Sequence, residues 1–346
     1  MNPRDVVIVS ACRTPIGKNM GQFKDVRARQ LAITAGAEAI KRADIDPKLI
    51  DGIVMGECFT AMEGSLAARQ VSMRLGFSER SNACVVNQNC ASGMRALDIQ
   101  ANNILLGKED IGMVIGVESM TNAPYVLEKA RMGYRMGDSK IFDNMLHDGL
   151  IDELSGGHMG LTAENVAEKY GITREECDKI AVRSHNLACK AIDEGIFKDE
   201  IVPVVIKSKK GEKVITDDEH PIRNCTMETL AKLKPAFKKD GVITAANASG
   251  INDAAAAVIL MSWEKCQELG KKPMAKLVTC VAEGVAPEVM GLGPAVAMPK
   301  ALKAAGLKWE DIDYFEVNEA FSAQVLGVER MLKEDYGYVV DWDKTN

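Results

Sequence analysis

An internal repeat restricts the folds that this chain can adopt. Residues 39–57 align without a gap with residues 301–319, at an offset of 262, and six of the nineteen positions are identical. Each copy has the pattern of a helix end, a short loop and a buried strand. Upstream, the strand-like run Val6–Ser10 has a counterpart in Ala275–Val281. The repeat predicts two α/β halves with mainly parallel sheets, although units of this kind can also resemble each other through composition alone.

The repeat also predicts where the second half stops. At the same offset Asn346 corresponds to Cys84, and in the first half the strand and turn that carry Cys90 come directly afterwards. The second half is therefore expected to end before its own copy of that element. Either the chain continues beyond Asn346 or it is an incomplete, inactive fragment, and the intact motifs described below favour the first interpretation.

The segment between the two halves has a different character. It is rich in Met, Gly and charged residues. Thr173 and Glu176 have the spacing of a capping box at the start of a helix, and Gly195 is a natural end for that helix. We expect an α/β protein with an N-terminal half at 1–120, a loop domain over the active face at 121–240, a return to the N-terminal half at 241–270 and an incomplete C-terminal half at 271–346.

Composition excludes several classes of function. A net charge of -6 argues against a nucleic-acid partner, because phosphate binding depends on clustered Lys and Arg. No apolar run reaches membrane-spanning length, and the first residues resemble neither a signal nor a transit peptide. The nine cysteines contain no CxxC pair and, with the four His, no zinc-site spacing. These features predict a cytoplasmic protein without membrane partners or metal.

Cys90 is the candidate nucleophile. Residues 84–90 have the pattern of a strand that ends in polar residues, and a helix is expected from Ala91 to a cap at Gly107. At such a junction the free N–H groups and the helix dipole stabilise negative charge and favour a thiolate. Small residues after Cys90 let a substrate approach, as in a nucleophile elbow. The pattern equally fits a buried structural cysteine that begins a helix.

Several motifs resemble those of thiolases. The first is the nucleophile motif of that family, which matches the run Val86–Ala96 around Cys90. The resemblance covers essentially the whole chain, and its loop segment at 136–150 is most similar to short-chain, biosynthetic acetoacetyl-CoA thiolases. The other matching motifs, all in the family's order, are Arg13–Gly17, His158–Gly160 with Thr162–Asn165, Asn247–Asp253 and Asn318–Phe321.

The resemblance implies a fold and a reaction. The fold is the five-layered αβαβα arrangement with two similar halves and a loop domain. In the reaction, Cys90 takes an acyl group from acetyl-CoA as a thioester and passes it to a second acetyl-CoA, giving acetoacetyl-CoA and CoA, or the reverse thiolysis occurs. The substrates are coenzyme A thioesters, and no metal or redox cofactor takes part. The resemblance also implies a homotetramer with contacts at 121–145.

Further site residues are implied by position in the motifs. Asn318 matches the residue that holds an oxyanion-hole water, a fixed polar group where the enolate oxygen develops charge. Arg223 lies near a family Arg that meets the nucleotide, across a one-residue gap. His158 is either a pocket residue or a structural one, and is not expected to be the base. Matches to positions that contact the pantetheine arm or wall it are Ser249, Ala245, Leu150, Met159, Phe237 and Phe321, for the last four of which core packing is the ordinary alternative.

The sequence departs from the family pattern in two respects. The His of a Gly-His-Pro motif and a second Cys in a Gly-rich motif, which activate the nucleophile and move the α-proton in thiolases, are not found between Met1 and Asn346. Gln88-Asn89 also stands where the family commonly has a basic or polar residue followed by an apolar one, which predicts an altered acyl preference.

Three other functions remain open on the sequence. The enzyme alternatives are a thiolase for larger or aryl 3-ketoacyl-CoAs and a decarboxylating ketosynthase of the same superfold. The His158–Gly160 motif argues against the ketosynthase. A non-catalytic CoA-binding or scaffold subunit is the alternative from another class.

Overall fold

The computed structural model describes residues 1–209 and 211–346, which form two compact units. The first unit contains 1–149, 195–220 and 251–278, and the second contains 150–194, 221–250 and 279–346. The three-part division expected from the sequence uses other boundaries and stays a prediction.

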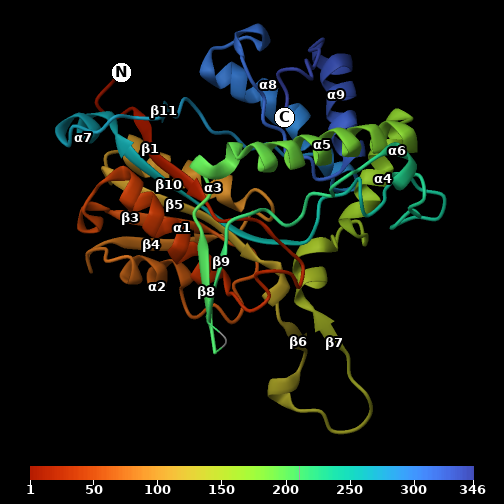
Figure 1. The fold of residues 1–346 in the computed structure, drawn as a ribbon, viewed down its shortest axis with the longest axis horizontal. Coiled ribbons are helices and arrows are strands. Elements are labelled where there is room, and N and C mark those ends of the chain that lie inside the picture. Colours follow the sequence, from red (N-terminus) through yellow and green to blue (C-terminus); the bar gives the residue numbers. More distant parts are fainter. Residues whose placement is uncertain (210) are drawn as a thin grey trace. The chain divides into compact units, whose positions relative to one another are not determined.

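A mixed sheet forms the centre of the first unit (Figure 1). Its order is β11-β1-β10-β5-β3-β4, and β2 pairs with β10 beside this path. The pairs β3–β4 and β3–β5 are parallel, whereas β10 is antiparallel to β1, β2 and β5. The strands are β1 (Val6–Arg13), β2 (Gly17–Lys18), β3 (Gly52–Gly56), β4 (Asn82–Val86), β5 (Ile111–Ser119), β10 (Asn252–Ser262) and β11 (Ala275–Lys276).

Helices cover both faces of this sheet. On one face, α1 (Ala28–Ala43), α2 (Ala67–Arg74) and α7 (Trp263–Glu268) share a core with alternate residues of the strands, such as Ile53 and Met55. On the other face, α3 (Ser92–Leu105) packs Ala96, Ala101 and Ile104 against Val54 and Val114. This alternation places the side chains of one strand in two cores, because successive residues point to opposite faces.

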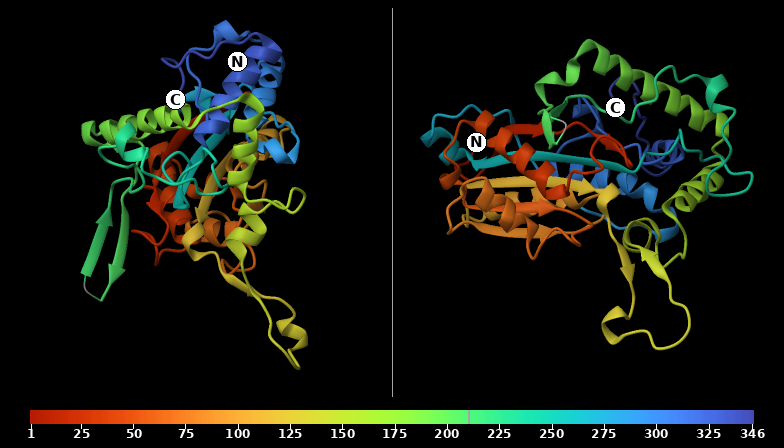
Figure 2. Two further views of the ribbon diagram at one scale, coloured as in Figure 1. Left: turned by 90° about the vertical axis from the view of Figure 1, so that its right-hand side faces the viewer. Right: turned by 60° about the horizontal axis from the view of Figure 1, so that its bottom comes forward.

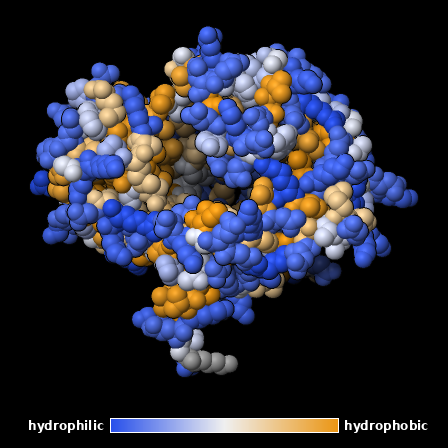
Figure 3. Space-filling view, turned by 45° about the horizontal axis from the view of Figure 1, so that its top comes forward, coloured by the Kyte–Doolittle hydropathy of each residue, from blue (hydrophilic) through white to orange (hydrophobic). Residues whose placement is uncertain are grey.

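Two hairpins complete the first unit (Figure 2). The first pairs β6 (Tyr125–Leu127) with β7 (Ile141–Asp143), and the second pairs β8 (Val204–Ser208) with β9 (Gly211–Ile215). Figure 3 shows hydrophobic side chains among hydrophilic ones on the second hairpin, where the cross-strand pair Val205 and Val214 is 48% and 56% exposed.

The second unit is mainly helical. Its core joins α4 (Met159–Tyr170) to α9 (Ser322–Tyr336), with Val166 and Leu326 among the buried residues. Gly327 lets the two helices approach closely, because a side chain there would meet Val166. The other α-helices described in this unit are α5 (Arg174–Glu194), α6 (Met227–Leu230) and α8 (Gly293–Ala305).

Short helices of other types connect these elements. In the first unit they are η1 (Pro47–Leu49), η2 (Met120–Asn122), η3 (Ala130–Met132), η4 (Leu146–Leu150), which is a π-helix that ends in the second unit, and η5 (Ile196–Asp199). In the second unit they are η6 (Pro287–Leu292) and η7 (Trp309–Asp311).

The two copies of the repeat have the same local structure at first and then differ. Helix α1 and η1 lead into β3 in the first copy, and α8 and η7 stand at the matching positions in the second. Residues 314–318, which match β3, do not belong to any described strand, and among the described residues Phe315 forms an isolated bridge to Thr345. Ala275–Val281 contributes only the two-residue β11, which pairs with β1.

One further expectation needs correction. The sheet is not mainly parallel, because the long strand β10 enters its centre antiparallel to both neighbours. Helix α3 turns Ala96, Gln100 and Ile104 to the sheet, while Met94 and Leu105 are 61% and 50% exposed.

Candidate active site

Cys90 lies in an exposed turn between β4 and α3. The strand ends at Val86, the helix begins at Ser92, and the thiol-bearing residue is exposed. Asn89 has a φ of +48°, a left-handed conformation that Asn tolerates better than most residues. The predicted strand-to-helix junction at Cys90 is therefore present, and the helix ends before Gly107 as expected.

Ser92 holds this turn together. Its hydroxyl accepts the N–H of Gln88 at 2.9 Å and donates to the carbonyl of Asn89 at 2.6 Å. The backbone N–H of Ser92 also donates to the Asn89 carbonyl, at 3.0 Å. The two residues before Cys90 are thus tied to the first residue of α3.

Residues at the end of β3 and directly after it also contact this turn. The Cys58 thiol donates to the Asn89 carbonyl at 3.2 Å, and the Asn87 side-chain amide donates to the Cys58 carbonyl at 3.5 Å. Gly56 has no room for a side chain, because a Cβ would lie on the backbone of Ser92. Contacts from Gly56 and from Cys58 therefore fix the position of the turn relative to the sheet.

The carboxyl-bearing residues Glu57 and Glu118 adjoin Cys58, one as its chain neighbour and the other through a hydrogen bond. Glu118 accepts the N–H of Cys58 at 2.8 Å and that of Phe59 at 3.2 Å. Burial raises the pKa of Glu118, although these two bonds lower it. Glu57 is 0% exposed, and burial raises its pKa to about 8, with the charges of Glu118 and Glu63 adding to the rise. Burial likewise raises the pKa of the Cys58 thiol to about 12.

Glu57, Cys58 and Glu118 lie outside the motifs and candidate residues predicted from the sequence. A carboxyl residue directly after the five buried residues of β3 was the available signal. Glu57 is also identical to Glu319 in the repeat, but that identity was used only as evidence for duplication.

In the second unit, several of the expected pocket residues meet around His158. Its ring stacks on Phe237 with centroids 4.7 Å apart, and Phe237 meets the Phe321 ring edge-on at 6.3 Å. The ring nitrogen Nδ1 accepts the N–H of Gly160 at 3.0 Å and so caps α4. Burial lowers the pKa of His158, so the neutral ring carries its proton on Nε2.

The Asn247–Asp253 motif places Ala245 and Ser249 on the surface of this unit. Both residues are exposed, while Asn247 between them is buried and donates to Asp178 at 2.9 Å. The Ser249 N–H donates to the carbonyl of Ala320 at 2.9 Å. This bond ties the motif to the segment that contains Asn318, which is exposed and lies in extended chain before α9.

The remaining expected residues are less closely connected. Met159 opens α4, and Leu150 precedes Ile151, which bridges to His158. The Arg223 guanidinium contacts the Asp193 carboxylate at 2.9 Å on the surface, and both side chains are more than half exposed. The structure thus brings His158, Phe237 and Phe321 into contact and gives Arg223 a different neighbour.

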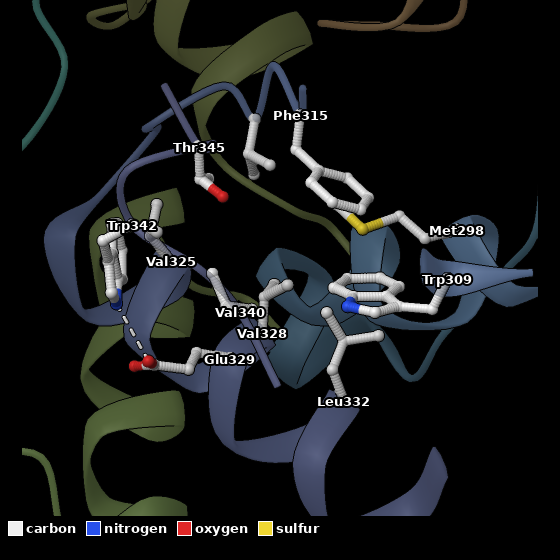
Figure 4. Close-up of a pocket in the computed structure, with 11 residues that line it drawn as sticks. Met298, Trp309, Phe315, Val325, Val328, Glu329, Leu332, Val340, Trp342 and Thr345 are labelled. Atoms are coloured by element: carbon white, nitrogen blue, oxygen red, sulfur yellow. Dashed lines mark hydrogen bonds between the residues drawn. The ribbon is translucent and has the colours of Figure 1, made fainter. Parts of the chain in front are cut away.

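A separate apolar cavity lies between α8, α9 and the last residues of the second unit (Figure 4). It measures about 310 Å³ with its open mouth included, and none of the expected site residues lines it. Trp309 stacks on Phe315 and on Tyr338 beside it, and Trp342 donates to Glu329 at 2.9 Å.

Within residues 1–209 and 211–346, no helix has the length and apolarity to cross a membrane. No group of three or more His, Cys, Asp or Glu side chains in these ranges is arranged to hold a metal ion.

Comparison with known proteins decides the family. Residues 6–264 match the model of the thiolase N-terminal domain, and residues 271–346 match that of the thiolase C-terminal domain. The chain belongs to the thiolase family. It is a thiolase-type acyltransferase with the thiolase α/β fold.

Individual thiolases are similar over almost the whole chain. An acetyl-CoA acetyltransferase of Syntrophomonas wolfei is 51% identical over 99% of this chain and 86% of its own length. A solved acetyl-CoA acetyltransferase from the same organism superposes with a TM-score of 0.98, at 63% identity, over 100% of this chain and 86% of that one. Human mitochondrial 3-ketoacyl-CoA thiolase gives a TM-score of 0.94 at 38% identity, with the same coverage.

Proposed function

We propose that this thiolase transfers acetyl groups between coenzyme A thioesters, with Cys90 as the nucleophile. Cys90 would accept the acetyl group of acetyl-CoA as a thioester, with release of CoA, and would pass it to the enolate of a second acetyl-CoA, which releases acetoacetyl-CoA and returns the Cys90 thiolate. The reverse reaction would cleave acetoacetyl-CoA with free CoA. The observation that carries the proposal is the exposed thiol at the start of α3, in the family's nucleophile motif.

The turn geometry suits a nucleophile. The first N–H groups of a helix have no partners within the helix, and the helix dipole favours negative charge beside them. Bonds from Ser92 and Cys58 hold the backbone around Cys90, so its position is set before a substrate binds. Preorganisation of this kind lowers the cost of reaching the reactive geometry.

The other candidate residues are proposed to contact the substrate. We propose that Asn318 binds the enolate oxygen through a water, and that Ala245 and Ser249 contact the pantetheine arm. Leu150, Met159, Phe237 and Phe321 would wall the arm. His158 would present its Nε2–H to the ligand, because Nδ1 is occupied by Gly160. Arg223 would meet the nucleotide only after leaving Asp193.

The proposal extends to cofactors and assembly. The chemistry described needs no metal or redox cofactor, since a thioester already activates both the carbonyl and the α-proton. We further propose a cytoplasmic homotetramer with contacts at 121–145. The apolar side chains of the β6–β7 hairpin support this, because Tyr125 and Ile141 are 68% and 66% exposed.

Trapping the acyl-enzyme tests the role of Cys90. The protein is incubated with labelled acetyl-CoA, quenched in acid and mapped by peptide mass, a measurement of one acyl transfer and not of turnover. We expect a single acetyl group on the peptide that contains Cys90, and none after Cys90→Ala. Cys84→Ser is the matched control, because Cys84 is a half-buried thiol on the adjacent strand. Labelling of another cysteine, or of none, would contradict the proposal.

A thiolase for larger 3-ketoacyl-CoAs is the second candidate. It is favoured by the similarity to human mitochondrial 3-ketoacyl-CoA thiolase and by the amide side chains Gln88 and Asn89 beside the nucleophile. Comparing kcat/KM for acetoacetyl-CoA with kcat/KM for longer and aryl 3-ketoacyl-CoAs separates the two.

A further inference from the structure

Glu57 is a buried acid without a hydrogen-bond partner. It follows β3 directly and is 0% exposed, and neither carboxyl oxygen has a partner among the residues that the structure describes. An ionised carboxylate in such a place is strongly unfavourable, whereas a neutral carboxylic acid costs much less to bury. Buried polar atoms without partners are rare, so this one calls for a physical reason.

The charges around Glu57 disfavour its ionisation further. Glu118 on β5 and Glu63 in the segment after β3 are both negative neighbours, and Arg29 on α1 is the positive one. Arg29 is already engaged, because its guanidinium donates to the Glu63 carbonyl at 2.8 Å and to Gln70 at 3.2 Å. Glu57 therefore has two negatively charged neighbours and one positively charged neighbour. Burial is the larger cause of its pKa of about 8.

The backbone beside Glu57 is bonded to the turn that carries Cys90. The Glu57 N–H donates to the Val86 carbonyl at 3.1 Å, at the last residue of β4. The next residue, Cys58, donates its thiol proton to the Asn89 carbonyl and its N–H to Glu118. A shift of residues 57–58 would therefore displace both ends of the turn.

We propose that Glu57 is a positioning residue that must be neutral for the Cys90 turn to keep its reactive geometry. The inference rests on the proposed function, in which Cys90 is acylated. At neutral pH the protonated side chain packs within the first unit beside the Glu118 carboxyl group. When the proton is released to solvent at alkaline pH, Glu57 becomes a buried carboxylate that repels Glu118 and Glu63, and β3 moves away from the turn.

Glu57→Gln separates this role from simple space filling. The amide has nearly the same shape as the neutral acid but cannot ionise. With a pKa of about 8, roughly a tenth of Glu57 remains neutral at pH 9. The rate of Cys90 acetylation by acetyl-CoA, followed by peptide mapping from pH 6.5 to 9.5, should fall above pH 8 in the wild type relative to E57Q. The expected difference at pH 9 is about tenfold.

Glu79→Gln is the matched control. It makes the same chemical change at an exposed residue of the same unit, and its profile should follow the wild type. Glu57→Leu gives a second neutral side chain of similar size, which answers the question if E57Q does not fold. Like E57Q, it should keep its rate above pH 8.

Thermal unfolding of the same proteins tests the protonation of Glu57 independently of acylation. Between pH 5 and 8 the melting temperature of the wild type should fall relative to that of E57Q, because only the unfolded wild type releases the proton. Parallel pH profiles of rate and melting temperature in wild type and E57Q would overturn the inference. If wild-type Cys90 is not acetylated at pH 7, the proposed function fails and the role of Glu57 in the reaction fails with it, whereas the melting temperatures would still report its protonation.

Discussion

Ser92 contributes one hydroxyl to the Cys90 turn, and that hydroxyl bonds the Gln88 N–H and the Asn89 carbonyl and lies 3.6 Å from the Cys58 thiol. It is 4% exposed, so water cannot replace the lost partner after Ser92→Ala. The Gln88 N–H would then be left without an acceptor, at a cost of about 1–3 kcal/mol.

We expect Ser92→Ala to lower the free energy of unfolding by about that amount and to slow Cys90 acetylation. Urea unfolding and the trapping experiment measure the two effects. Ser78→Ala is the control, because its hydroxyl accepts only the Arg80 N–H in an exposed turn and should cost under about 0.5 kcal/mol. Equal effects of the two substitutions would contradict this role of Ser92.

Glu57 has an energetic consequence for the whole protein. Its pKa rises from an ordinary 4.5 to about 8 in the folded state. Below pH 4.5 both folded and unfolded states hold the proton, and between 4.5 and 8 only the folded state holds it. Stability therefore falls with rising pH in this window, by up to about 1.4 kcal/mol per unit, and stops falling above pH 8.

At the scale of elements, the close approach of β3 and α3 positions Cys90, the proposed nucleophile. Gly56 on β3 faces the first turn of α3, and Gly93 lies 3.4 Å from the position where a Cβ on Gly116 of β5 would stand. Small residues on both strands let the helix N-terminus rest directly on the sheet. The position of Cys90 over the sheet thus depends on the absence of side chains beneath α3.

Gly56→Ala should displace the start of α3. The new methyl group would clash with backbone of Ser92, which cannot rotate away as a side chain could. We expect a loss of about 1–3 kcal/mol in the free energy of unfolding and slower acetylation of Cys90. Gly293→Ala, at the open start of α8, meets nothing within 4 Å and should leave stability unchanged or raise it. A Gly56→Ala protein that matches the Gly293→Ala protein in both measurements would refute the argument.

At the scale of the whole molecule, the proposed tetramer makes a prediction about the β6–β7 hairpin. Leu127 and Ile141 face each other across this hairpin, and both are exposed in the isolated chain. Exposed apolar pairs on a projecting element are typical of interfaces.

Ile141→Glu should therefore lower the molar mass measured by light scattering during size-exclusion chromatography, without changing the melting curve of the separated chains. Val205→Glu introduces the same charge on the β8–β9 hairpin at a 48% exposed residue and should leave the mass unchanged. A tetramer that survives Ile141→Glu would place its contacts elsewhere.

Local pattern alone predicted the elements that depend on neighbouring residues. The capping box at Thr173 is present, with Glu176 accepting the Thr173 N–H at 2.7 Å, and Gly195 follows α5 with a φ of +71°. The repeat correctly located the end of α8, and the polar run before Ala91 located the Cys90 turn. These features are encoded in residues a few positions apart, so the sequence by itself determined them.

Only the tertiary structure decided which distant residues meet. Strand direction was wrong in the prediction because β10 reaches the sheet from more than a hundred residues away, and nothing local records which way it enters. For the same reason, a lone Glu57 in the sequence gave no sign of its burial. Its protonation depends on Glu118, 61 positions later, and on the core that excludes water from both. The sequence determined the turn that presents Cys90, the proposed nucleophile, whereas the packing of distant strands decided what surrounds it.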